Sequence, residues 1–131
     1  MYKDLVQRDD KSDYLVVYIE EAHATDEWPI SSSRYVPSGE PVNVRQPRSV
    51  EDRAKLARDL LKMYGIEEGE RLKVAVDSPE GNAFEKAYAP WPVRMYVIED
   101  GVVQFLSAPT DSAHDAAGLR DWLEERHAEI I

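Results

Sequence analysis

Residues 13–28 read DYLVVYIEEAHATDEW, and this stretch decides the fold. Its first part, residues 14–19, is apolar or aromatic without strict alternation, which is typical of a short parallel strand buried on both faces. Four polar side chains follow at once: Glu20, Glu21, His23 and Asp26. Because α/β folds carry their chemistry at the carboxyl ends of parallel strands, the stretch predicts a functional site there. The alternative is an ordinary solvated loop after a core strand.

Composition and charge narrow the class of protein. A chain of 131 residues with 43% hydrophobic and 32% charged residues predicts a single globular domain over residues 1–131. The sequence has no apolar run of membrane-spanning length and no signal or transit peptide pattern at its start, so we expect no membrane segment and a cytoplasmic location. A formal net charge of −10 without clustered Lys and Arg argues against a nucleic-acid partner.

The chain contains no cysteine. Disulfides, thiolate catalysis and cysteine-ligated zinc or iron–sulfur sites are therefore excluded for these 131 residues. A metal site made by the carboxylates and imidazole of residues 20–26 is also disfavoured, because the sequence offers no second histidine that would converge on them. We expect no metal.

The remainder of the chain alternates helices and strands around a long loop, residues 22–47. Ser49 predicts the N-cap of a helix that ends at Gly65, with Arg53 on its solvent side. A second strand over 72–77 and a short helix over 82–88 follow. The Asp100–Gly101 pair then predicts a hairpin between the last two strands, before a final helix. We place those strands at 93–99 and 102–106 and that helix at 112–129, packed through Ala116, Leu119, Trp122 and Leu123.

This order of elements indicates an α/β fold. A βαβ half followed by a ββα half is the thioredoxin-like arrangement, a three-layer sandwich, and Pro92 stands where that fold places a proline beside its active site. Other α/β sandwiches have compatible patterns.

Several segments in the same order resemble the iodothyronine deiodinase family. Residues 18–28, YIEEAHATDEW, are similar to the family's Tyr-Ile-Glu-Glu-Ala-His-x-Ser-Asp-Gly-Trp signature. Residues 48–53, RSVEDR, are similar to its Arg-Ser-Leu-Glu-Asp-Arg at a helix start. The resemblance continues in WPVRMYVI at 91–98 and in GLRDWLE at 118–124, so it covers nearly the whole chain.

The resemblance implies a thioredoxin-like oxidoreductase, from a family of selenoproteins, that removes iodide reductively from an iodinated aromatic substrate. Selenocysteine is that family's nucleophile and thiols are its electron source. The resemblance assigns catalytic roles to Glu20, Glu21 and His23. It assigns substrate binding to Asp26, Trp28, Pro92 and Arg94. A histidine beside carboxylates can move the proton that such a reaction needs. The alternative is that Glu21 and His23 only hold the long loop in place.

The chain also departs from the family pattern. The family's first strand and its Cys- or Sec-containing turn are missing, so the fold would be truncated before its central strand, and the 131 residues alone would be inactive. Pro47 replaces a histidine of some members, and residues 107–111 replace a glycine-rich segment. A selenocysteine codon read as a stop would place the start at Met1, a hypothesis that an in-frame stop codon shortly upstream would support.

Two functional readings follow from these departures. In the first, the chain is part of a deiodinase-like enzyme that acts on a small aromatic substrate with a thiol reductant. In the second, it is a redox-inactive thioredoxin-like module that binds a small aromatic ligand or a partner protein through residues 20–28. Without a central strand, the strands at 14–19 and 93–99 have unpaired edges. We expect these two strands to close up on each other, to pair with another chain, as in a homodimer, or to leave an open gap in the sheet.

Overall fold

A computed structural model describes residues 8–29, 43–107 and 116–130. The described chain is a mixed α/β protein whose elements follow one another as β1 (Tyr14–Tyr18), α2 (Val50–Tyr64), β2 (Leu72–Val76), α3 (Ala83–Tyr88), β3 (Tyr96–Glu99), β4 (Val102–Leu106) and α4 (Ala116–Ile130). It divides into two compact units, residues 13–91 and residues 1–12 with 92–131. Strand β3, predicted over 93–99, begins three residues later than predicted. Residues 30–42 of the predicted long loop lie outside the described part.

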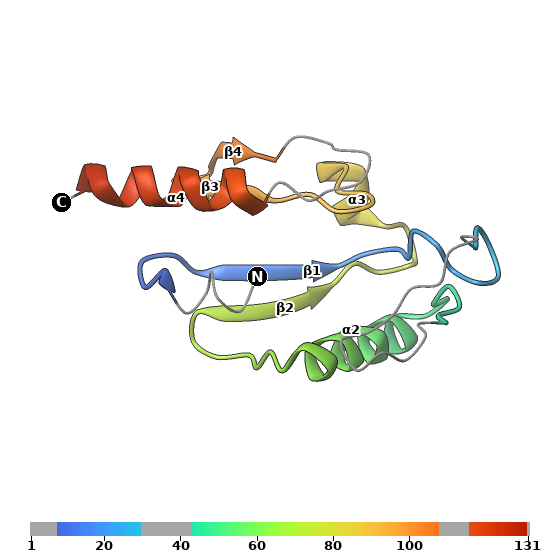
Figure 1. The fold of residues 1–131 in the computed structure, drawn as a ribbon. Helices are drawn as coiled ribbons and strands as arrows, with labels where there is room; N and C mark the ends of the chain where they lie inside the picture. Colours follow the sequence, from blue (N-terminus) through green and yellow to red (C-terminus); the bar gives the residue numbers. More distant parts are fainter. Residues whose placement is uncertain (1–7, 30–42, 108–115, 131) are drawn as a thin grey trace. The chain divides into compact units, whose positions relative to one another are not determined.

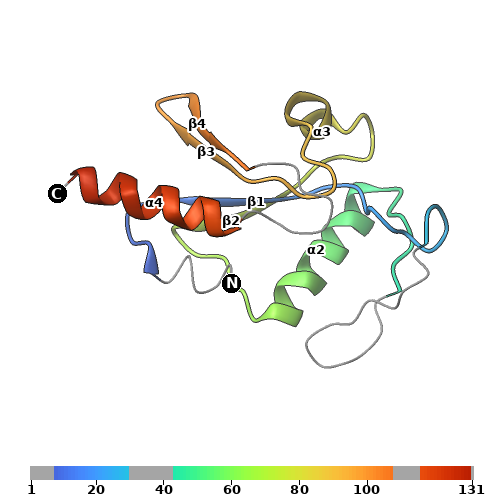
Figure 2. The same ribbon diagram turned by 45° about the horizontal axis from the view of Figure 1, so that its top comes forward.

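The first unit is built on a βαβ motif. β1 pairs in parallel with β2, in a register that sets Tyr14 opposite Leu72 and Tyr18 opposite Val76. Helix α2 packs on this pair (Figure 1). Both arrowheads point the same way in Figure 1, and the loop that follows β1 leaves the pair at that end. α3 follows β2 at the same end (Figure 2). Polar residues after the two strands are therefore brought to one edge.

Helix α2 forms where the sequence predicts it because its two ends carry their own signals. The Ser49 hydroxyl accepts the Asp52 backbone N–H at 3.1 Å, which caps the first turn. At the other end Gly65 adopts a left-handed conformation with φ 61°. Its N–H donates to the Lys62 carbonyl, and the next N–H, of Ile66, donates to the Leu61 carbonyl. This pair of bonds is a Schellman motif, which glycine favours because it has no Cβ.

The prediction that β1 is buried on both faces is wrong. Leu15 is 65% exposed and Val16 is 37% exposed. Among the described residues β1 pairs only with β2, in a two-stranded sheet. Because consecutive side chains of a strand point to opposite faces, each face of β1 carries an exposed apolar side chain.

The second unit contains the predicted hairpin and the last helix. β3 and β4 are antiparallel and joined by Asp100 and Gly101, whose φ values of 52° and 76° are those of a type I′ turn. At the end of the hairpin away from the turn, Ser107 pairs with Met95. The Ser107 N–H donates to the Met95 carbonyl and the Ser107 hydroxyl accepts the Met95 N–H, both at 2.9 Å. In the described part of the chain, no strand joins this hairpin to the β1–β2 pair. The hairpin and the β1–β2 pair are two separate sheets.

Helix α4 buries the apolar residues that the sequence predicts. Leu119 and Leu123 are 8% and 6% exposed, and the ring of Trp122 lies 6.4 Å from that of Phe105 on β4. Nε2 of His127 lies 3.6 Å from the carboxylate of the buried Asp9. The start predicted for this helix, residues 112–115, lies outside the described residues.

Candidate functional site

The segment after β1 leaves the sheet together with the segment after β2. The backbone N–H of Asp77 donates to the Tyr18 carbonyl at 2.9 Å, which extends the strand pairing by one position. Glu20 lies two residues beyond Tyr18 on one strand, and Asp77 directly follows Val76 on the other. The polar residues after β1 therefore stand at the carboxyl end of a parallel strand, where the sequence predicts a functional site.

Gln46 is the residue that fixes the segment after β1, and it is only 5% exposed. Its side-chain carbonyl accepts the Glu21 backbone N–H at 3.0 Å, and its amide nitrogen donates to the Glu21 carbonyl at 3.0 Å. The same nitrogen donates to Glu27 Oε2 at 3.0 Å, and the Gln46 backbone N–H donates to Asp26 Oδ1 at 2.8 Å. One buried amide thus holds both ends of the loop.

Sequence reasoning missed Gln46. It lies in a segment, residues 43–48, that has no regular secondary structure and no periodic pattern. Its partners are 19 to 25 positions away along the chain. Gln46 stands between Arg45 and Pro47, and this local sequence does not predict a role for it. Its role is seen only in the folded chain.

Glu21 is held by both its backbone and its side chain. Besides the two bonds to Gln46, its carboxylate accepts a hydrogen bond from the Tyr18 hydroxyl. A carboxylate with these local partners has a role in holding the loop, which was the alternative considered for Glu21. Its predicted catalytic role stays a prediction.

Asp26 also makes contacts inside the loop. Its side chain is 23% exposed and has Arg45 and Arg48 at 3.6 and 3.9 Å. The hydrogen bond from the Gln46 N–H lowers the pKa of Asp26, partial burial opposes this, and the two arginines lower the pKa further. Arg48 also pairs with Glu27 at 2.9 Å. The loop is therefore closed by charge as well as by Gln46.

The lowered pKa of Asp26 predicts an acid-side loss of stability. Because the folded chain holds the Asp26 proton less tightly than the unfolded chain, this stabilisation is present above the ordinary pKa of 3.8 and is lost as the pH falls through the folded value. In Asp26→Asn, we expect the difference in unfolding free energy from the unmodified chain to be largest near neutral pH and to shrink below about pH 4. Urea unfolding between about pH 3 and pH 7 measures this. Asp10→Asn, at an exposed position, is the matched control, and a difference independent of pH would contradict the prediction.

His23 and two tryptophans form an aromatic group beside this loop. His23 Nδ1 lies 3.1 Å from the Trp28 carbonyl oxygen. A carbonyl only accepts, so Nδ1 carries the hydrogen and Nε2 of the neutral ring is left as an acceptor. The His23 and Trp28 rings are 5.4 Å apart, and Trp28 stacks on Trp91 with centroids 6.4 Å apart and planes 10° apart. Trp28 and Trp91 are 63% and 40% exposed, so the stack offers a ring surface to a ligand.

The prediction that Arg53 lies on the solvent side of α2 is wrong. Arg53 lies inside the unit. It is 1% exposed, and its Nη1 donates to the Asp77 carbonyl at 2.8 Å and to Asn82 Oδ1 at 3.0 Å. The Asp77 carboxylate, 6% exposed, accepts the backbone N–H groups of Phe84 and Glu85 and so holds the start of α3. The segment between β2 and α3 needs a buried donor, and this requirement explains why the helix turns an arginine inward.

Glu85, on the short helix α3, has a pKa that is raised by its surroundings. Burial raises the pKa of Glu85, and the charge of Glu20 and a hydrogen bond with it raise the pKa further. Asp77 acts in the same direction, and Arg53 lowers the pKa of Glu85. Sequence reasoning selected Glu20 but missed Glu85, which belongs to a six-residue helix without any motif.

The predicted site residues are thus only partly brought together. Glu20, Glu21, His23, Asp26 and Trp28 lie on one ordered loop of the unit formed by residues 13–91. Pro92 is exposed and Arg94 is half-buried, and both belong to the other unit. Substrate binding by these two residues stays a prediction.

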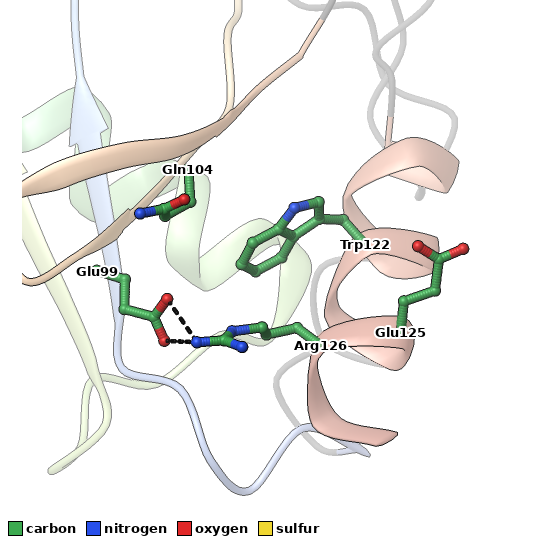
Figure 3. A pocket seen from close by; sticks show the side chains of 5 residues that line it. All are labelled: Glu99, Gln104, Trp122, Glu125 and Arg126. Carbon is green, nitrogen blue, oxygen red and sulfur yellow. Dashed lines mark hydrogen bonds and ion pairs between the residues drawn. The ribbon is translucent and has the colours of Figure 1, made fainter. Parts of the chain in front are cut away.

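The second unit has a depression of its own between the hairpin and α4, with a volume of about 330 Å³. Figure 3 shows Arg126 reaching from α4 to Glu99, whose two carboxylate oxygens lie 3.0 Å from Arg126 Nη2. Trp122, Gln104 and Glu125 complete the lining. Two charges that pair with each other in an open, polar depression serve to hold α4 against the hairpin.

No three His, Asp or Glu side chains in the ranges 8–29, 43–107 and 116–130 are grouped so that they could hold a metal ion. None of the helices in those ranges is long and apolar enough to cross a membrane.

Comparison with known proteins identifies the family. The model of the family described as iodothyronine deiodinase matches residues 1–127. The chain is 34% identical over 112 residues to the thyroxine 5-deiodinase of Rattus norvegicus and 33% identical over 112 residues to that of Homo sapiens, in each case 86% of this chain and 33% of the relative. It is 30% identical over 92 residues to the type I iodothyronine deiodinase of Xenopus laevis, 70% of this chain and 31% of that protein.

The chain spans about a third of the length of these curated relatives. The matched region nevertheless includes almost all of the described residues, among them the whole loop from Glu20 to Trp28 and the residues that hold it. This chain belongs to the iodothyronine deiodinase family.

Proposed function

We propose that this chain is the substrate-binding and proton-handling part of a reductive dehalogenase that removes iodide from an iodinated aromatic compound. The observation that carries the proposal is the ordered Glu20–Trp28 loop at the carboxyl ends of β1 and β2, in a chain whose relatives are named for thyroxine and iodothyronine deiodination. The proposal also retains the thioredoxin-like arrangement, with which the βαβ motif and the following hairpin agree.

Each part of the loop has a task in this proposal. The exposed faces of Trp28 and Trp91 suit an aromatic ring, since such stacking favours offset, parallel planes. His23 presents Nε2 as an acceptor, so it can take the proton of a phenol or of a thiol. Arg45 and Arg48, 82% and 69% exposed, suit a substrate carboxylate.

The electrons must come from elsewhere. The 131 residues contain no cysteine, so in this proposal a selenol or thiol outside them attacks the iodine, and a thiol reductant regenerates it. Glu20, Glu21 and His23 then act only on protons, and Asp26, Trp28, Pro92 and Arg94 act on binding. Assembly with a second copy of the chain remains a prediction.

A second candidate function rests on the same absence of cysteine. A redox-inactive module would use the Trp28–Trp91 stack to bind a small aromatic ligand or a partner protein, without chemistry. Both functions predict binding, but only the first predicts a preference for iodine and release of iodide.

Tryptophan fluorescence tests the binding part directly on the 131-residue chain. We expect thyroxine to quench the fluorescence saturably, because iodine is a heavy atom, and the iodine-free parent thyronine to bind more weakly. Trp28→Phe should weaken thyroxine binding about two- to tenfold, the value of one aromatic stacking contact. Trp122→Phe, in the other unit, is the matched control and should leave the affinity unchanged. Equal affinities for Trp28→Phe and the unmodified chain would overturn the assignment of the ring site.

A further inference from the structure

The two tryptophans of the stack stand on different segments, and each segment is tied to the start of helix α2. Trp28 ends the loop that Gln46 holds through its side-chain amide. Gln46 lies three residues before Ser49, the N-cap of α2, and Arg53 lies four residues after it. Arg53 in turn binds the segment that leads to the second tryptophan. One short stretch of chain therefore contacts both halves of the ring site.

Helix α3, on the way to the second tryptophan, has an unusual arrangement at its start. Asn82 is its N-cap residue, and an N-cap asparagine ordinarily accepts a hydrogen bond from the second or third N–H of its own helix. Here the Asp77 carboxylate takes both of these donors, the N–H groups of Phe84 and Glu85, at 3.0 and 3.1 Å. The Asn82 side chain makes no capping bond and is therefore available to another partner.

Arg53 is the partner of the Asn82 side chain. Its Nη1 donates to Asn82 Oδ1 at 3.0 Å and to the Asp77 carbonyl at 2.8 Å, and Arg53 is 1% exposed. Asn82 has a φ of 45°, a left-handed conformation in which glycine carries no strain and a residue with a side chain does. Asparagine at this position thus supplies an acceptor at a conformational cost, and that acceptor serves Arg53 and not its own helix.

The chain between Asn82 and Trp91 is short and ordered. The Ala89 N–H closes the far end of α3 on the Glu85 carbonyl at 2.8 Å. Pro90, which precedes Trp91, is buried, and its ring fixes its own φ. Because a helix of six residues moves as one body, a displacement of Asn82 would be carried to Trp91 and so to the tryptophan stack.

We propose that Arg53 is a positioning residue for the ring site: by binding Asn82 it fixes α3 and so holds Trp91 against Trp28. The inference rests on the proposed function for the identity of the ligand, whereas the position of Trp91 in the free chain does not depend on that function. It gives the second arginine of RSVEDR, residues 48–53, a role in the site beyond its contribution to stability.

The NMR signal of the Trp91 indole N–H tests this position in the unliganded 131-residue chain. Trp28→Ala should shift the signal, because the ring current of the stacked neighbour is lost. Asn82→Gly keeps the left-handed backbone and the buried Arg53 but removes the acceptor, so in this background Trp28→Ala should shift the signal much less. Asn82→Asp restores an acceptor and should restore the full shift. Lys86→Ala, at an exposed position on α3, is the control and should leave the shift unchanged.

Thyroxine affinity supplies the functional readout. Asn82→Gly should weaken thyroxine binding about two- to tenfold, the value of one aromatic contact, and Asn82→Asp should restore it. In a Trp91→Ala background, Asn82→Gly should cause no further loss, because Asn82 and Arg53 act on the ligand only through Trp91. A further loss in that background would show a general effect on the fold and would overturn the positioning role.

The two measurements separate this inference from the proposed function. If the unmodified chain does not bind thyroxine, the ring site of the proposed function fails, while the indole shift still decides whether the bond to Arg53 positions Trp91. If thyroxine binds, and neither the shift nor the affinity differs between Asn82→Gly and the unmodified chain, the positioning role is overturned and the proposed function stands.

Discussion

Replacing Arg53 by methionine is expected to lower the free energy of unfolding by about 3–5 kcal/mol. Arg53 is 1% exposed, and its removal leaves the buried Asp77 carbonyl and the Asn82 side chain without their donor. It also removes a positive charge that lowers the pKa of Glu85. A methionine fills the same space but can neither donate a hydrogen bond nor supply that charge.

Urea unfolding at neutral pH measures the effect, with Arg58→Met as the control on the same helix. Arg58 is exposed, so its replacement should change the free energy of unfolding by no more than about 0.5 kcal/mol. The Arg53 variant should also recover part of its stability as the pH falls and the neighbouring carboxyl groups take up protons. A similar decrease in the free energy of unfolding in the two variants would contradict the prediction that the buried Arg53 stabilises the fold.

Gln46→Ala is expected to lower the free energy of unfolding by about 2–4 kcal/mol, since each buried group left without a partner costs about 1–3 kcal/mol. The groups affected are the N–H and the carbonyl of Glu21, whereas the Glu27 carboxylate keeps its pairing with Arg48. The loop that carries His23 and Trp28 should loosen as a result. We therefore expect hydrogen exchange at Glu21 to become faster and thyroxine to bind more weakly.

The exposed Gln104 on β4 provides the control, since its replacement by alanine should leave both the exchange at Glu21 and the binding unchanged. Gln46→Glu separates shape from hydrogen bonding: the carboxylate keeps the size of the amide but cannot donate to Glu27 or to the Glu21 carbonyl. Protection of the Glu21 amide that survives in Gln46→Ala would contradict the role of Gln46 as the residue that fixes the loop.

Elements whose signals are local were predictable from the sequence. Ser49 and Gly65 define α2 because a cap and a left-handed residue act within one helical turn. Asp100 and Gly101 define the hairpin because a type I′ turn needs two residues with positive φ. The βαβ order followed from these boundaries and from the apolar β1 and β2 segments.

Features that depend on distant partners were not predictable. Arg53 carries the same local signal as any charged residue on a helix, and only the carbonyl of Asp77, 24 positions later, draws it inside. Gln46 and Glu85 likewise act through residues on other segments. The site loop was found because its polar residues are contiguous, whereas the residues that hold it are scattered.

Iodide release by the full product of the gene, with thyroxine as substrate and a dithiol as reductant, tests the proposed function most directly. The account predicts release of one iodide for each ring deiodinated, at a rate that falls by about 10²-fold or more in His23→Ala, because a positioned proton-transfer group is lost. Lys73 is exposed, so Lys73→Ala is the control and should leave the rate unchanged. Saturable binding of thyroxine with no iodide released by the unmodified protein would contradict the account and establish a binding module in its place.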